Sequence, residues 1–105
     1  MSNVTAAMLN NVYYILGNHP EVGIRPMLVV VRDKRDGLCI VELLQRDMYS
    51  RLPRMEKVTA KDLFYSATEA ALAGKALGER LEPVGADGIF HVVRFDDPKV
   101  YESER

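Results

Sequence analysis

The sequence predicts an α+β fold, in which an antiparallel sheet of three to four strands with a central β-hairpin carries two packed helices. Three observations lead to this prediction. Two runs rich in β-branched residues flank an Asp-Gly pair, which is typical of a hairpin. A capping box precedes an alanine-rich segment in the second half of the chain. Apolar residues near the N-terminus recur with the period of a helix.

The first helix is predicted over Val4–Leu16. Its apolar positions follow a period of about 3.6 residues, which gives one buried face and one wet face. Gly17 is then expected just past the end of this helix, because glycine adopts the left-handed conformation without a Cβ clash. The apolar positions are Val4, Met8, Leu9, Val12, Ile15 and Leu16.

The hairpin is predicted from the segments Pro26–Arg32 and Leu38–Gln45, with the turn at Asp33–Gly37. A loop of three, four or five residues is compatible with this spacing. The two strands do not alternate between apolar and polar residues, as a sheet with one wet face should. Both faces of the hairpin are therefore expected to be covered, which favours a homo-oligomer, most simply a dimer.

The second helix is predicted to begin at a capping box formed by Ser66 and Glu69 and to end before Pro83. Gly74 lies in its interior, at a cost of about 1 kcal/mol relative to alanine. Close approach to a neighbouring element would offset this cost. A last strand is predicted over Ile89–Phe95, and residues 54–59 are left open between a short strand and a loop. The buried helical side is expected to contain Ala70, Ala71, Leu72, Ala73, Ala76, Leu77 and Leu81.

The expected core combines residues from the sheet and from both helices. Phe64 is expected to pack where the second helix begins. The predicted sheet core comprises Met27, Val29, Val31, Leu38, Ile40, Val41, Leu43, Phe90, Val92 and Val93. The predicted helical contribution comprises Met8, Val12, Ile15, Leu72, Ala73 and Leu77.

Length and composition place the chain among small globular proteins. With 105 residues, 48% of them hydrophobic and 28% charged, it is expected to form one domain over residues 1–97, followed by a loose polar tail over residues 98–105. No apolar run approaches the roughly 18 residues that span a bilayer. The N-terminus has no basic residue before Arg25, so no signal peptide is expected. The single cysteine, Cys39, suits a reducing compartment and predicts a cytoplasmic protein.

Four residues are candidates for carrying chemistry. His91 in a strand and His19 in a loop have no second ligand at metal-binding spacing, so neither a metal site nor a cofactor is expected. Cys39 lies among apolar strand residues and is expected to be a buried, inert thiol. Glu42 is the only charged residue in its strand, and it is expected to face water or to pair with an arginine or lysine on a neighbouring strand.

A basic segment in the middle of the chain gives the second functional hypothesis. Residues 25–57 hold eight basic and five acidic side chains, whereas residues 58–105 hold six basic and nine acidic ones. A cluster of basic side chains with an aromatic residue is able to hold a phosphate chain. The candidate anion or nucleic-acid contacts in segment 46–57 are Arg46, Tyr49, Arg51, Arg54 and Lys57.

Because strong folding signals accompany no catalytic constellation, the sequence favours a small non-enzymatic interaction or regulatory protein. It is expected to act as a homodimer through an apolar sheet or helix face, or to bind another protein, and not to bind a membrane. The alternative is anion or nucleic-acid binding through the basic segment. A third hypothesis is an enzyme whose site assembles across a dimer.

Overall fold

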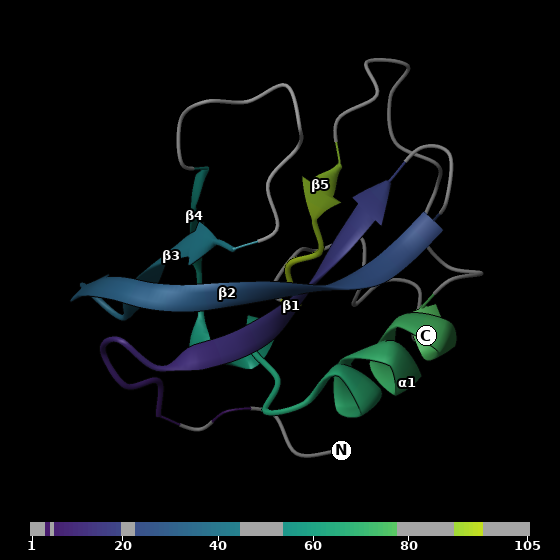
Figure 1. Ribbon diagram of the computed structural model, residues 1–105, viewed down its shortest axis with the longest axis horizontal. Helices are drawn as coiled ribbons and strands as arrows, with labels where there is room; N and C mark the ends of the chain where they lie inside the picture. Colours follow the sequence, from purple (N-terminus) through teal and green to yellow (C-terminus); the bar gives the residue numbers. More distant parts are fainter. Residues whose placement is uncertain (1–3, 5, 20–22, 45–53, 78–89, 96–105) are drawn as a thin grey trace.

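The computed structural model describes residues 4, 6–19, 23–44, 54–77 and 90–95. They form a five-stranded antiparallel sheet in the order β4-β3-β2-β1-β5, which curves towards a barrel, with one α-helix against it (Figure 1). The strands are β1 (Val12–His19), β2 (Gly23–Arg35), β3 (Leu38–Leu43), β4 (Met55–Val58) and β5 (His91–Val92). The helices are the 3-10 turn η1 (Ala60–Asp62) and α1 (Ala67–Leu77).

The predicted fold class is wrong in one respect, because the described residues contain one α-helix rather than two packed helices. The antiparallel sheet is present, but the predicted first helix is replaced by β1, which pairs with β2 from Val12 to His19. Residues 12–15 are β-branched or aromatic, and such residues favour a strand. Because β1 is buried on both faces, its apolar residues form a continuous run that also satisfies a helical period.

Gly17 consequently lies within a strand instead of ending a helix. It pairs with Arg25 on β2 and with Val92 on β5. A Cβ atom at this position would lie 2.9 Å from Cδ2 of Phe90 and 3.2 Å from Cγ of Met27. Glycine is therefore required here by the close approach of the Phe90 ring.

The predicted hairpin is confirmed as β2 and β3, and its loop is shorter than expected. Arg35 pairs with Leu38, so the loop contains only Asp36 and Gly37. Their φ angles are 52° and 79°, as a type I′ turn requires at both central positions. Arg32 is an extra residue in β2, because the register shifts between Val31 and Asp33.

Two hydrophobic clusters lie on opposite faces of β1. The inner cluster lies within the curve of the sheet, and the outer cluster lies between the sheet and α1. The inner cluster contains Val4, Ala7, Tyr13, Ile15, Val29, Val31, Cys39, Val41, Leu43, Val58 and Leu63. The outer cluster contains Leu16, Phe64, Ala70, Ala73, Leu77 and Val93. Two covered faces were expected for the hairpin, and its consecutive residues Val29, Val30 and Val31 are all buried within one chain.

The start of α1 confirms the predicted N-cap. Ser66 Oγ accepts a hydrogen bond from the amide of Glu69 at 3.2 Å. The predicted close approach at Gly74 is also confirmed, since a Cβ atom there would lie 2.9 Å from Cγ2 of Ile24 and 3.2 Å from Cδ2 of Leu16. Gly78, four residues further along the predicted helix, lies outside the described residues.

Several core predictions are confirmed, including Phe64, which is 1% exposed beside the start of α1. Four are wrong: Met8, Val12, Leu38 and Leu72 have exposed fractions of 62%, 49%, 38% and 60%. The prediction for Met8 and Val12 depended on the helix that does not form. Leu72 lies on the solvent side of α1, and Leu38 adjoins the hairpin turn. Ala71 and Ala76 are also exposed.

Three further predictions concern the ends of the fold. The short strand left open over residues 54–59 is present as β4. The last predicted strand is present only as β5, although the amide of Val93 continues the pairing by donating to the carbonyl of Leu16 at 2.8 Å. Residues 98–105 lie outside the described part of the chain, so the loose tail stays a prediction.

Candidate functional site

An apolar surface on the outer side of the sheet is the first candidate site. Strand register aligns Val12, Val30, Glu42 and Met55 in one row across four strands. In the adjacent row, the amide of Leu44 donates to the carbonyl of Leu28 at 2.9 Å. Val12, Leu44 and Met55 have exposed fractions of 49%, 41% and 44%. Val30 lies in the same row but is buried, so we call Val12, Leu28, Leu44 and Met55 the outer patch.

One ion pair lies within the outer patch. Nε of Arg32 lies 3.3 Å from Oε1 of Glu42, and the two side chains project from β2 and β3. The interpretation of Glu42 as a cross-strand partner of a basic residue is therefore confirmed. The pair adds one positive and one negative charge to the outer patch.

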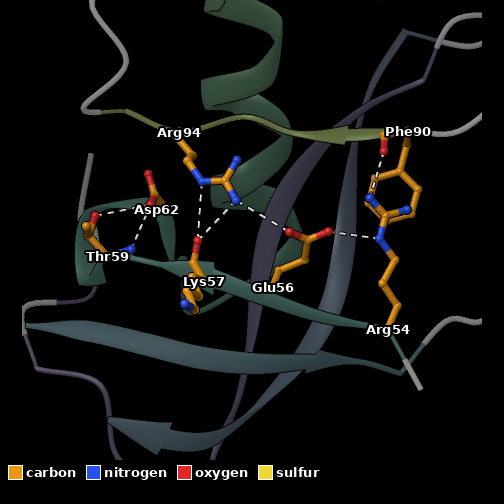
Figure 2. Close-up of polar contacts among 7 residues, drawn as sticks. All are labelled: Arg54, Glu56, Lys57, Thr59, Asp62, Phe90 and Arg94. Carbon is orange, nitrogen blue, oxygen red and sulfur yellow. Dashed lines mark hydrogen bonds and ion pairs between the residues drawn. The ribbon is translucent and has the colours of Figure 1, made fainter. Parts of the chain in front are cut away.

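Arg54 provides the first contact of a second candidate site, where β4 at one edge of the sheet lies near residues 90–95 at the other (Figure 2). Its Nε donates to Oε1 of Glu56 at 2.8 Å, and its NH2 group donates to the carbonyl of Phe90 at 2.9 Å. The guanidinium carbon lies 3.9 Å from the centroid of the Phe90 ring, a cation–π contact. Arg54 thereby joins the start of β4 to residues 90–95, which we call the strap.

Arg94 provides a matching contact at the other end of the strap. Its NH2 group donates to the carbonyl of Lys57 at 3.2 Å and lies 3.4 Å from Oε2 of Glu56. Glu56 therefore lies between the two arginines, as Figure 2 shows. Its side chain is only 17% exposed, so the carboxylate is shielded from much of the solvent.

Asp62 makes a third polar contact with the strap. It is fully buried at the end of η1, and its Oδ1 accepts the amide of Phe95 at 2.7 Å. Its Oδ2 accepts the amide and the hydroxyl of Thr59 at 2.8 and 3.1 Å. The spacing of Thr59 and Asp62 is that of a capping box, a sequence signal that could have identified this carboxylate.

The predicted basic site is only partly described. Arg46, Tyr49 and Arg51 lie outside the described residues. The guanidinium of Arg54 contacts Glu56 and Phe90, and Lys57 is exposed on β4. Sequence patterns did not point to Arg94, Glu56 or Asp62 as contacts of the strap, because the residues that they join are distant in the chain.

The other candidate residues lie apart from one another. His91 is exposed and pairs with Asn18, and His19 ends β1. Cys39 is buried, as predicted, and is a free thiol. Burial raises the pKa of the Cys39 thiol above its ordinary value of 9.0, and the nearby charge of Lys34 opposes this shift in part. Within the described ranges, no three acidic, histidine or cysteine side chains gather to form a metal-binding group.

No protein-family model matches the chain, and neither a curated protein nor a solved structure shows significant similarity to it. Among the described helices, none has both the length and the apolar character needed to cross a membrane.

Proposed function

We propose that the protein is a small interaction protein that forms a homodimer through its outer patch. The observation that carries the proposal is that large apolar side chains stay exposed on one face of the sheet: Val12 on β1, Met55 on β4 and Leu44 just after β3. Apolar residues scattered over a surface are ordinary, whereas a contiguous apolar patch is typical of an interface. Val12 and Met55 lie at the two ends of the row and are about half exposed.

The charges within the outer patch suit contact with a second copy. A twofold interface brings the same surface together from both chains, so each charged group needs an opposite charge on that surface. Arg32 and Glu42 supply one charge of each sign, side by side. A twofold axis near this pair would place Arg32 of one chain beside Glu42 of the other. Two like charges would then not face each other across the interface.

Light scattering over the micromolar range tests the dimer. The expected mass is twice the 11.8 kDa of one chain. Leu44→Lys and Met55→Lys place a charge in the outer patch at side chains that are already exposed, so we expect monomers that keep the fold. Leu72→Lys is the matched control, because Leu72 is 60% exposed on the solvent side of α1.

A mass of 11.8 kDa throughout the concentration range would overturn the proposal, as would a dimer that persists in both patch variants. Retention of the wild-type protein on heparin at physiological salt tests the competing anion-binding hypothesis. Binding of that kind should weaken steeply with added salt, because each phosphate contact releases counterions.

We also infer that the protein acts in the cytoplasm. The free, buried thiol of Cys39 supports this inference, because cytosolic thiols are kept reduced. Selective permeabilisation of source cells, with detection of the native protein in the released fraction, is the corresponding measurement.

A further inference from the structure

The strap, residues 90–95, is attached differently along its two sides. Towards β1 it makes backbone contacts, with Val92 opposite Gly17, His91 opposite Asn18, and the Val93 amide on the carbonyl of Leu16. Towards β4 and η1, every contact that joins the described residues by a hydrogen bond involves a side chain. These contacts are made by Arg54, Arg94 and Asp62.

Glu56 is shared by the two arginines of this side-chain contact. Arg54 reaches the first residue of the strap, and Arg94 projects from near its end. The side chains of Arg54 and Arg94 are 34% and 42% exposed, so water can solvate them if the strap moves away. Removal of the carboxylate therefore weakens both attachments at once, without leaving a fully buried charge.

We infer that the strap opens as a local unit while the rest of the sheet stays folded, and that Glu56 is the group that holds it closed. Segments at the edge of a fold open locally at a lower free energy than its core strands. The strap has a short ladder to β1, whereas β2 and β3 pair at six positions. Opening would uncover the edge of β1 and the inner-cluster residues beneath Phe90 and Val92. It would also separate Val93 and Phe95 from the outer cluster, where the Phe95 ring lies 5.7 Å from that of Phe64.

Native-state amide hydrogen exchange tests this inference. The reporters are the amides of Val93 and Phe95, which are bonded to Leu16 and Asp62, and the reference is the β2–β3 ladder. In the wild-type protein we expect the reporters to exchange faster than the ladder. In Glu56→Gln we expect the exchange rates of these two amides to rise about tenfold more, because a charged hydrogen bond is lost. The exchange rates of the ladder amides should not change.

Glu42→Gln is the matched control. The side chains of Glu42 and Glu56 are 18% and 17% exposed, and each accepts from an arginine. Glu42, however, joins two strands that already share a backbone ladder. We therefore expect Glu42→Gln to leave the exchange of Val93 and Phe95 unchanged.

Arg94→Lys provides a second route if Glu56→Gln does not fold. Lysine keeps the charge but lacks the fork with which Arg94 reaches both Glu56 and the carbonyl of Lys57, so the strap amides should again exchange several-fold faster. The inference is overturned if the strap and ladder amides exchange together in the wild-type protein. It is also overturned if the Glu56 and Arg94 variants change both sets equally, or if Glu42→Gln affects the strap as strongly.

Discussion

The β2–β3 ladder and the contact between β4 and the strap hold segments of the same sheet together by different means. The ladder consists of backbone hydrogen bonds and a two-residue turn, and its side chains are largely free to serve the core or the outer patch. The contact at the strap depends on individual side chains, namely Arg54, Glu56, Asp62 and Arg94. A backbone ladder tolerates many side-chain changes, whereas a contact made by side chains is sensitive to each one.

The largest expected effect comes from Asp62→Ala, which removes one of the side chains that hold the strap. The change leaves the amides of Thr59 and Phe95 and the Thr59 hydroxyl without their acceptor. A fully buried donor left unsatisfied costs about 1–3 kcal/mol. Because these three donors are only partly buried, we expect a total loss of about 3 kcal/mol. Chemical denaturation measures it, and Asp62→Asn, which keeps one carbonyl acceptor, should lose less. An unchanged midpoint for Asp62→Ala would contradict the role of this carboxylate as the shared acceptor.

Gly37→Ala tests the ladder through its turn. Gly37 has a φ of 79°, and a Cβ atom added there would have nothing within 4 Å, so backbone strain is the expected cost. We expect a loss of about 1–2 kcal/mol in the free energy of unfolding. The control is Asp36→Asn, which suits the same turn and should be nearly neutral. Equal midpoints for Gly37→Ala and wild type would mean that the turn relaxes without strain.

Ser66→Ala is a reference substitution at the start of α1, outside the β2–β3 ladder and the contact with the strap. The N-cap bond from the Glu69 amide to Ser66 Oγ is lost, and the expected cost is about 1 kcal/mol. Thermal or chemical denaturation measures the change, and Ser66→Asp, another good N-cap, is the control. Faster exchange confined to the Val93 amide in Ser66→Ala would show that α1 and the strap are coupled, contrary to this expectation.

The smallest expected effect on stability at neutral pH comes from Cys39→Ala, a substitution within the β2–β3 ladder. The thiol lies in β3, and its pKa is raised by burial. A raised pKa in the folded state gives a stabilisation that is present below the ordinary value of 9.0 and lost as the pH rises through the folded-state pKa. We therefore expect the wild-type protein to lose stability relative to Cys39→Ala as the pH rises above 9.0. Thiol reagents should label the native protein slowly, and rapid labelling would contradict burial.

Local signals explain which parts of the fold the sequence predicts correctly. The Asp36-Gly37 pair requires only its own backbone geometry, and the capping interaction of Ser66 lies within four residues. The predicted first helix fails because burial on both sides of β1 removes the alternation that distinguishes a strand from a helix. The β-branched and aromatic residues of this stretch are the better indication.

The candidate sites follow the same rule. The pairing of Glu42 across the strands is predictable, because its neighbouring strand is adjacent in sequence. Arg54 is predicted only as an anion contact, since its partner Phe90 is 36 residues away. The position of Asp62 beneath the strap depends on how the whole sheet curves, which no local pattern expresses. Pairings between distant segments are set by tertiary structure, so a single sequence does not predict them.

The pairing of Gly17 with Val92 has a consequence for how the chain folds. The hairpin closes a loop of two residues, whereas β1 and β5 join positions 75 residues apart. Because distant contacts carry a larger entropic cost of loop closure, we expect the hairpin to form early and the strap to dock last. During synthesis, the edge of β1 at Leu16–Asn18 therefore has to wait for residues 90–95 to leave the ribosome. Over that interval this edge is open to pairing with a neighbouring nascent chain.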